Sequence, residues 1–325
     1  MIIFQTFSFA HLWSPWWIAV TVIIAMAYAF LFLPNRKRPF PGSRPVTARR
    51  MLFFYTGLIL FYLAVGGPID LLGHFLFFMH MVKMALLYII IPPLVIMGFP
   101  KWFYMRFHRD NRFMRVLGFF SRPILANVMF ATLFSIYHMP FIFDLSMTNL
   151  LVKTVYTTVL FISALLVWWP LLSPIPNHQD LSSIRKIAYL YLGAFLLAPS
   201  CALIVFGNHP IYATYTDPQT WATALGLCIS GDPAAILQSL GGPQFLGSMT
   251  PLEDQKIGGV LMKITQEIVY GAALAFTFYR WAHRERAKEP EQAIEPHRGK
   301  GPGGAEKPGQ AKGTDNPRIW TVQRG

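Results

Sequence analysis

The residues best suited to chemistry in this sequence are histidines and methionines in one long apolar stretch. It contains Met79-His80-Met81-Val82-Lys83-Met84, and His74 lies six residues before His80. On a helix, His80 and Met84 share a face, and His74 and Met81 are nearly eclipsed. Imidazole with thioether is the soft ligand set that suits Cu(I), whereas hard ions prefer carboxylates. The pattern predicts copper chemistry, against the plainer hypothesis that the methionines fill gaps in a core.

A second histidine ends another apolar stretch, in the sequence Tyr137-His138-Met139-Pro140. Two helices in contact could bring His80 and His138, with one or two thioethers, to one point. Such neutral ligands would hold Cu(I) in a low-dielectric region without a buried carboxylate. The alternative is that both histidines hydrogen-bond to loop carbonyls and the methionines only pack. The expected metal ligands, with the last two as second choices, are His80, His138, Met84, Met81, Met139, His74 and Cys201.

Three charged residues, Lys83, Lys263 and Glu267, fall inside apolar stretches. A lone charge within a bilayer costs at least about 2.5 kcal/mol, so each of them needs a partner. Glu267 could pair with Lys263 in its own helix or with Lys83 across helices. We favour the second pair, because Lys83 and Glu267 lie at similar depth and Lys263 can extend outward. Such a pair is either structural or part of a proton or ion relay.

The two cysteines, Cys201 and Cys228, both fall on the side of the membrane that we expect to be outside. A single disulfide is compatible with that oxidising side. Alternatively, a cysteine thiolate could bind copper, or both cysteines could be free thiols without a role. The sequence leaves these three open.

Composition indicates a membrane protein. Apolar residues make up 54% of the 325 residues and charged residues 13%, whereas a soluble domain carries about 25% charged residues. A spanning helix needs about 20 mostly apolar residues. We therefore predict an all-α protein with seven transmembrane helices. The seven stretches are His11–Leu33, Met51–Gly66, His74–Gly98, Pro123–His138, Leu150–Leu172, Ile184–Gly207 and Ile257–Trp281.

Lys and Arg residues cluster in alternate loops, after the first, third, fifth and seventh stretches. By the positive-inside rule the N-terminus lies outside and the C-terminus in the cytoplasm. We expect a transmembrane domain over residues 1–288, with an outer loop at about 208–256 that contains a short helix around Trp221–Ile229. Residues 289–325 are rich in Pro, Gly, Lys and Glu, which predicts a disordered cytoplasmic tail.

The sequence lacks the motifs of the common enzyme classes. There is no Walker loop, HExxH, GxSxG, CxxC or dinucleotide fingerprint, so we expect a protein that is not an enzyme. The net charge of +13 is, in a membrane protein, typical of cytoplasmic loops that face anionic lipid. We therefore expect lipid and no nucleic acid as a partner.

Several short motifs, in order and spacing, resemble the CtaG-type cytochrome c oxidase assembly factors of Bacillus-like bacteria. The resemblance covers about Trp13 to Trp281 and excludes the tail. It rests on Met79-His80-Met81, Ile91-Pro92-Pro93-Leu94, Gly98-Phe99-Pro100, His138-Met139-Pro140, Trp168-Trp169-Pro170-Leu171, Pro199-Ser200-Cys201-Ala202, Asp254-Gln255 and Gly258-Gly259.

The resemblance implies a seven-helix protein of the bacterial cytoplasmic membrane that matures a haem–copper oxidase. Its partners would be subunits of that oxidase, and its cargo copper for the binuclear centre. Many family members have a second histidine one turn after the first in the third span, where this chain has Met84. That departure favours thioether ligation and Cu(I), and leaves His80 and His138 as the best-matched ligands.

Two other functions remain open at this point. In a membrane redox protein, paired histidines would ligate haem, although His80 lies deeper than His138 in this topology. In a small-solute or ion transporter, Lys83 and Glu267 would line the pathway. The oligomeric state does not follow from the sequence.

Overall fold

The computed structural model describes residues 7–32, 45–107, 112–174, 181–229, 232–245 and 249–293. Within these ranges the chain forms helices and no strand, which confirms the all-α prediction. The chain divides into two compact units, residues 1–281 and 282–325, and the architecture below is that of the first unit.

The helices follow one another with mostly short connections. The first half contains α2 (Phe9–Trp13), α3 (Pro15–Phe32), α4 (Ala48–Val65), α5 (Pro68–Phe75), α6 (Phe77–Ala85), η1 (Leu86–Ile90), α7 (Ile91–Gly98), α8 (Lys101–Phe107) and α9 (Arg112–Phe120). The second half contains α10 (Pro123–Tyr137), α11 (Pro140–Thr148), α12 (Leu150–Leu172), α13 (Ser183–Val205), η2 (Ala213–Tyr215), α14 (Pro218–Ile229), α15 (Pro233–Leu240) and α16 (Pro251–Ala293).

Five helical segments are long and apolar enough to cross a membrane, and α10 with α11, bent by 75°, would make a sixth. They cover six of the seven predicted stretches. The seventh forms part of α16, but Lys263, Gln266 and Glu267 lower its hydropathy, and it is not among these segments. Seven spans and the orientation of the termini are therefore not confirmed. The five segments are Phe9–Phe32, Ala48–Phe75, Phe77–Gly98, Leu150–Leu172 and Ser183–Val205.

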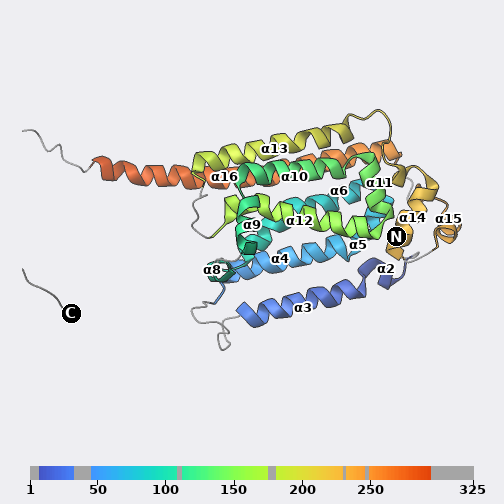
Figure 1. Cartoon of the computed structure of the whole chain (residues 1–325), viewed down its shortest axis with the longest axis horizontal. Coiled ribbons are helices and arrows are strands. Elements are labelled where there is room, and N and C mark those ends of the chain that lie inside the picture. Colours follow the sequence, from blue (N-terminus) through green and yellow to red (C-terminus); the bar gives the residue numbers. More distant parts are fainter. Residues whose placement is uncertain are drawn as a thin grey trace, which may run out of the picture. The chain divides into compact units, whose positions relative to one another are not determined.

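The long helices of residues 1–281 run side by side (Figure 1). Helix α10 contacts both α12 and α13, while α7 contacts both α4 and α12. The short helices gather at the ends of the bundle: α2, α14 and α15 lie at one end, and α8 and α9 at the other (Figure 1). We call the end that carries α14 the capped end. The predicted helix around Trp221–Ile229 is confirmed as α14.

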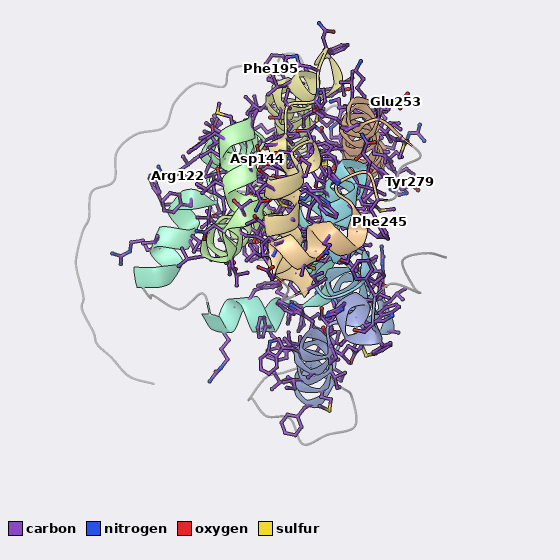
Figure 2. All side chains as sticks on the ribbon, turned by 90° about the vertical axis from the view of Figure 1, so that its right-hand side faces the viewer. Arg122, Asp144, Phe195, Phe245, Glu253 and Tyr279 are labelled. Carbon is purple, nitrogen blue, oxygen red and sulfur yellow. The ribbon has the colours of Figure 1, made fainter. Side chains whose placement is uncertain are left out.

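The outside of the bundle is apolar. Phe195 and Tyr279, which lie at its edge in the end-on view of Figure 2, are 75% and 67% exposed. Leu151 on α12 and Ile23 on α3 are similarly open. Large apolar side chains at this density on several helices would be costly in water. The exterior therefore indicates a membrane protein.

The predicted third stretch is not one helix. Leu76 is extended, with φ −133° and ψ 123°, so His74 lies in the last turn of α5 while His80 lies in α6. The expected alignment of His74 with Met81 on one helix face was therefore wrong. Farther along, η1 is a π-helix, in which the N–H of Ile91 donates to the Leu86 carbonyl. Two prolines follow, at residues 92 and 93, and they lack the N–H groups that regular α-helical bonds would need there.

The C-terminal prediction is only partly covered by the described residues. Helix α16 continues to Ala293, so residues 289–293 are helical where we expected disorder to begin. The rest of the predicted tail, residues 294–325, lies outside the described residues.

Candidate metal site

The first turn of α6, which carries His80, is held by a residue from the far end of the sequence. The Asp254 carboxylate accepts hydrogen bonds from the backbone N–H groups of Phe77, at 2.6 Å, and Phe78, at 2.9 Å. The residue before α6, Leu76, has no side chain that could cap these groups. A carboxylate on the free N–H groups of a helix start is favourable, so Asp254 fixes where α6 begins.

Two adjacent glycines let α16 approach this helix closely. A Cβ atom on Gly258 would lie 2.7 Å from the Phe77 ring and 3.0 Å from Cγ of Met81. A Cβ atom on Gly259 would lie 2.7 Å from a methyl group of Val205 on α13. The pair therefore allows α16 to contact both α6 and α13. The neighbouring Gln255 adds to this packing, because its amide donates to the Ile204 carbonyl at 3.1 Å.

His80 is buried among aromatic rings. It is 2% exposed, and its ring centroid lies 4.9 Å from Phe143, 6.0 Å from Tyr137 and 6.1 Å from Phe77. Its Nε2 atom has no hydrogen-bond partner among the described residues. Most buried polar atoms of proteins have such a partner, so this atom calls for an explanation.

His138 also has a buried Nε2 atom without a hydrogen-bond partner among the described residues, and its tautomer is defined. It is fully buried, and its Nδ1 atom lies 2.8 Å from the Phe134 carbonyl. Because a carbonyl only accepts, Nδ1 carries the proton and Nε2 carries the lone pair. That Nε2 atom has no partner in the described part of the chain. The Tyr212 hydroxyl donates to the His138 carbonyl at 2.9 Å, where α10 ends.

The two histidines belong to one cluster. Both lie beside the ring of Tyr137, at centroid distances of 6.0 Å for His80 and 5.2 Å for His138. Met81 and Met84 of α6 are fully buried in the same core. Two neutral imidazoles with an unused nitrogen each, near buried thioethers, fit a soft monovalent metal such as Cu(I).

Three of the expected ligands are not placed for this role. Met139 is 52% exposed. His74 has both ring nitrogens engaged, Nδ1 with the Asp70 carbonyl at 2.9 Å and Nε2 with Lys153 Nζ at 3.1 Å. Cys201 is buried, but the described residues contain no group of three His, Cys, Asp or Glu side chains that could hold a metal ion.

The cross-helix pair of Lys83 and Glu267 is not formed. Lys83, 7% exposed, makes an ion pair with Asp70 of α5. Glu267 instead pairs with Lys263 in its own helix at 2.6 Å, and its side chain is 57% exposed. The break at Leu76 explains the difference, because it brings α5 alongside α6 and gives Lys83 a nearer carboxylate.

Sequence reasoning missed Asp70 and Lys153. Asp70 is the first acidic residue of the chain, and it falls between two apolar stretches, where a loop was expected. Lys153 is the one charged residue of the apolar stretch Leu150–Leu172. A charge in such a stretch indicates a functional or paired residue, as it did for Lys83. The structure joins both through His74 and Lys83 into one polar cluster next to the histidine pair.

A third missed residue, Asp144, anchors the loop over the site. Its carboxylate accepts from the N–H groups of Ala213 and Thr214, at 3.0 and 2.9 Å, and from the Thr214 hydroxyl at 2.6 Å. Figure 2 shows it at the capped end, which faces the viewer. This loop carries Tyr212 and Tyr215, whose rings pack on Phe77.

The cysteines are both free. Cys201 is buried in α13 and Cys228 is half-buried in α14. Of the three alternatives for them, the structure therefore does not show the disulfide.

The site lies in a region that matches a known family. A family model described as cytochrome c oxidase caa3 assembly factor (Caa3_CtaG) matches residues 26–284, more than half of the chain. The searches of curated proteins and of solved structures returned no match. The matched region includes α6, which carries His80, the end of α10, where His138 lies, and the start of α16, whose Asp254 caps α6. The chain therefore belongs to the cytochrome c oxidase caa3 assembly factor family.

Proposed function

We propose that this assembly factor binds Cu(I) between His80 and His138 and delivers it to the haem–copper oxidase. One observation carries the proposal: two buried imidazole Nε2 atoms, on α6 and at the end of α10, have no partner among the described residues. Each such unpaired atom costs about 1–3 kcal/mol. A bound cation would use both lone pairs, and copper is then the cargo of the protein.

The surroundings support Cu(I) over a harder ion. Met81 and Met84 offer thioethers in the same core, and the carboxylates of Asp70, Asp144 and Asp254 are already hydrogen-bonded. Soft, uncharged ligands suit a monovalent, soft ion. Met84 stands where many family members have a histidine, which is consistent with thioether ligation.

We further propose that the capped end faces the outside of the bacterial cytoplasmic membrane. The supporting observation is that the basic residues, such as Lys101, Arg115 and Arg122, lie in and around α8 and α9 at the opposite end. Copper would then reach the site from outside and pass to an oxidase subunit in the same membrane. The role needs no catalysis by this chain.

Copper content of purified variants tests the site. His80→Ala and His138→Ala should each lose Cu(I) supplied anaerobically, as measured by mass spectrometry after desalting. His209→Ala is the matched control, because His209 is exposed and lies beyond the end of α13. Full copper in both site variants, together with a fully active oxidase in cells, would refute the proposal.

Visible absorbance separates the haem alternative. A protein that holds haem between His80 and His138 would show a Soret band, and the copper proposal predicts none. The transporter alternative rested on Lys83 with Glu267, and these two residues have separate partners.

A further inference from the structure

A cluster of charged groups lies next to the histidine pair. It consists of Asp70 and His74 on α5, Lys83 on α6 and Lys153 on α12. The Lys83 ammonium is paired with the Asp70 carboxylate. The Lys153 ammonium lies 3.1 Å from His74 Nε2, which is a neutral acceptor because Nδ1 of that ring donates to the Asp70 carbonyl. Within the described residues, the carboxylate of this cluster is therefore paired with Lys83 and not with Lys153.

This cluster adjoins His80 directly. Lys83 lies three residues after His80 on α6, and positions three apart are neighbours on a helix. On the other side, a Cβ atom on Gly73 would lie 3.3 Å from the Cα atom of His80, so α5 touches α6 at that point.

The three carboxylates near the site each have contacts other than Lys153. Asp70 is bound to Lys83. Asp144 accepts three hydrogen bonds from Ala213 and Thr214, and Asp254 accepts two from the start of α6. The donors to Asp144 and Asp254 are neutral groups, so these two carboxylates keep their charge, but neither of them pairs with Lys153. Among the described residues, Lys153 forms no ion pair.

We propose that the ammonium of Lys153 acts as a charge filter, which lowers the affinity of the site at His80 and His138 for divalent ions such as Zn²⁺ more than for monovalent Cu(I). The inference rests on the copper site proposed above. Coulomb repulsion scales with the product of the charges, so an ammonium penalises a divalent ion twice as much as a monovalent one at the same point. Selectivity against a competitor is commonly built from such a repulsive element.

The filter makes a quantitative prediction for Lys153→Met. The variant loses a positive charge but keeps a side chain of similar length. Its affinity for both ions should rise, and the factor for Zn²⁺ should be the square of the factor for Cu(I). If the affinity for Cu(I) rises about threefold, for example, the affinity for Zn²⁺ should rise about tenfold. Cu(I) and Zn²⁺ are both d¹⁰ ions, so a ligand-field preference does not enter the comparison.

Chelator-competition titrations of the full-length protein in detergent measure both affinities. Lys153→Arg keeps the charge and should behave like the wild type, and Lys263→Met is the control for a half-exposed lysine already paired within α16. Lys153→Gln provides a second neutral variant, should Lys153→Met not fold. Equal changes for Zn²⁺ and Cu(I) in a neutral variant would overturn the filter and leave the copper site in place. A wild-type protein that binds no Cu(I) would overturn both.

Discussion

Asp254, in the first turn of α16, accepts a hydrogen bond of 2.6 Å from the backbone N–H of Phe77, which is 177 residues earlier in the chain. This contact supplies the helix cap that α6 cannot form with its own residues. It also ties the position of His80 to the start of α16.

Asp254→Asn should therefore destabilise the protein. An amide offers one accepting oxygen and no charge, so one of the two bonds is lost, at a cost of about 1–3 kcal/mol. Thermal unfolding in detergent measures the effect. Glu253→Gln is the matched control in the same turn, because Glu253 is exposed and its carboxylate accepts hydrogen bonds from its near neighbour Thr250. Equal losses in the two variants would argue against a special role for Asp254.

Gly258→Ala should disturb the packing of α16 on α6. The new methyl group would lie 2.7 Å from the Phe77 ring, and overpacking of this kind costs about 1–3 kcal/mol. Gly271→Ala, on the same helix, meets no atom within 4 Å and should be neutral or stabilising by up to about 1 kcal/mol. The two melting temperatures give the comparison. A Gly258→Ala protein as stable as Gly271→Ala would mean that the close approach is not required.

Asp70→Asn should be strongly destabilising, by about 3–5 kcal/mol, because it leaves the buried Lys83 ammonium without its counter-charge. Adding Lys83→Met should recover part of the loss. A double-mutant cycle on unfolding free energies measures the coupling. Glu267→Gln, at an exposed ion pair, should cost less than about 1 kcal/mol. Additive effects of the two buried substitutions would show that Asp70 and Lys83 do not interact.

The proposed orientation places the C-terminal end of α16 in the cytoplasm. Reporter fusions after Glu289 and in the loop that precedes α14 measure it. We expect activity from a cytoplasm-dependent reporter at the first position and from an export-dependent reporter at the second, because the basic residues flank α8 and α9. The reverse pattern would place the capped end inside.

The single helices were predictable where local sequence decides them. The stretch Leu150–Leu172 was predicted with the bounds that α12 has, because a long apolar run between Asn149 and Ser173 leaves little choice. The break at Leu76 was not predictable, since no Gly or Pro marks it. The start of α6 is held by the carboxylate of Asp254, 177 residues away, and such a long-range contact cannot be inferred from the residues around Leu76.

The two histidines of the candidate site could be singled out from the sequence, whereas most of their surroundings could not. His80 and His138 were identified from residue type and position, and the structure places them in one cluster. Glu267 was predicted as the partner of Lys83 because the two residues lie at similar depth along ideal helices. That prediction is wrong because α5 packs beside α6 and brings Asp70 to Lys83. Lys153 carried the same signal as Lys83 and was overlooked.

X-ray absorption at the copper edge of the Cu(I)-loaded protein tests the central claim most directly. The account predicts imidazole scattering together with a sulfur contribution, both lost in the His80→Ala, His138→Ala double variant and retained in His209→Ala. A metal environment without imidazole, or one unchanged in the double variant, would contradict it.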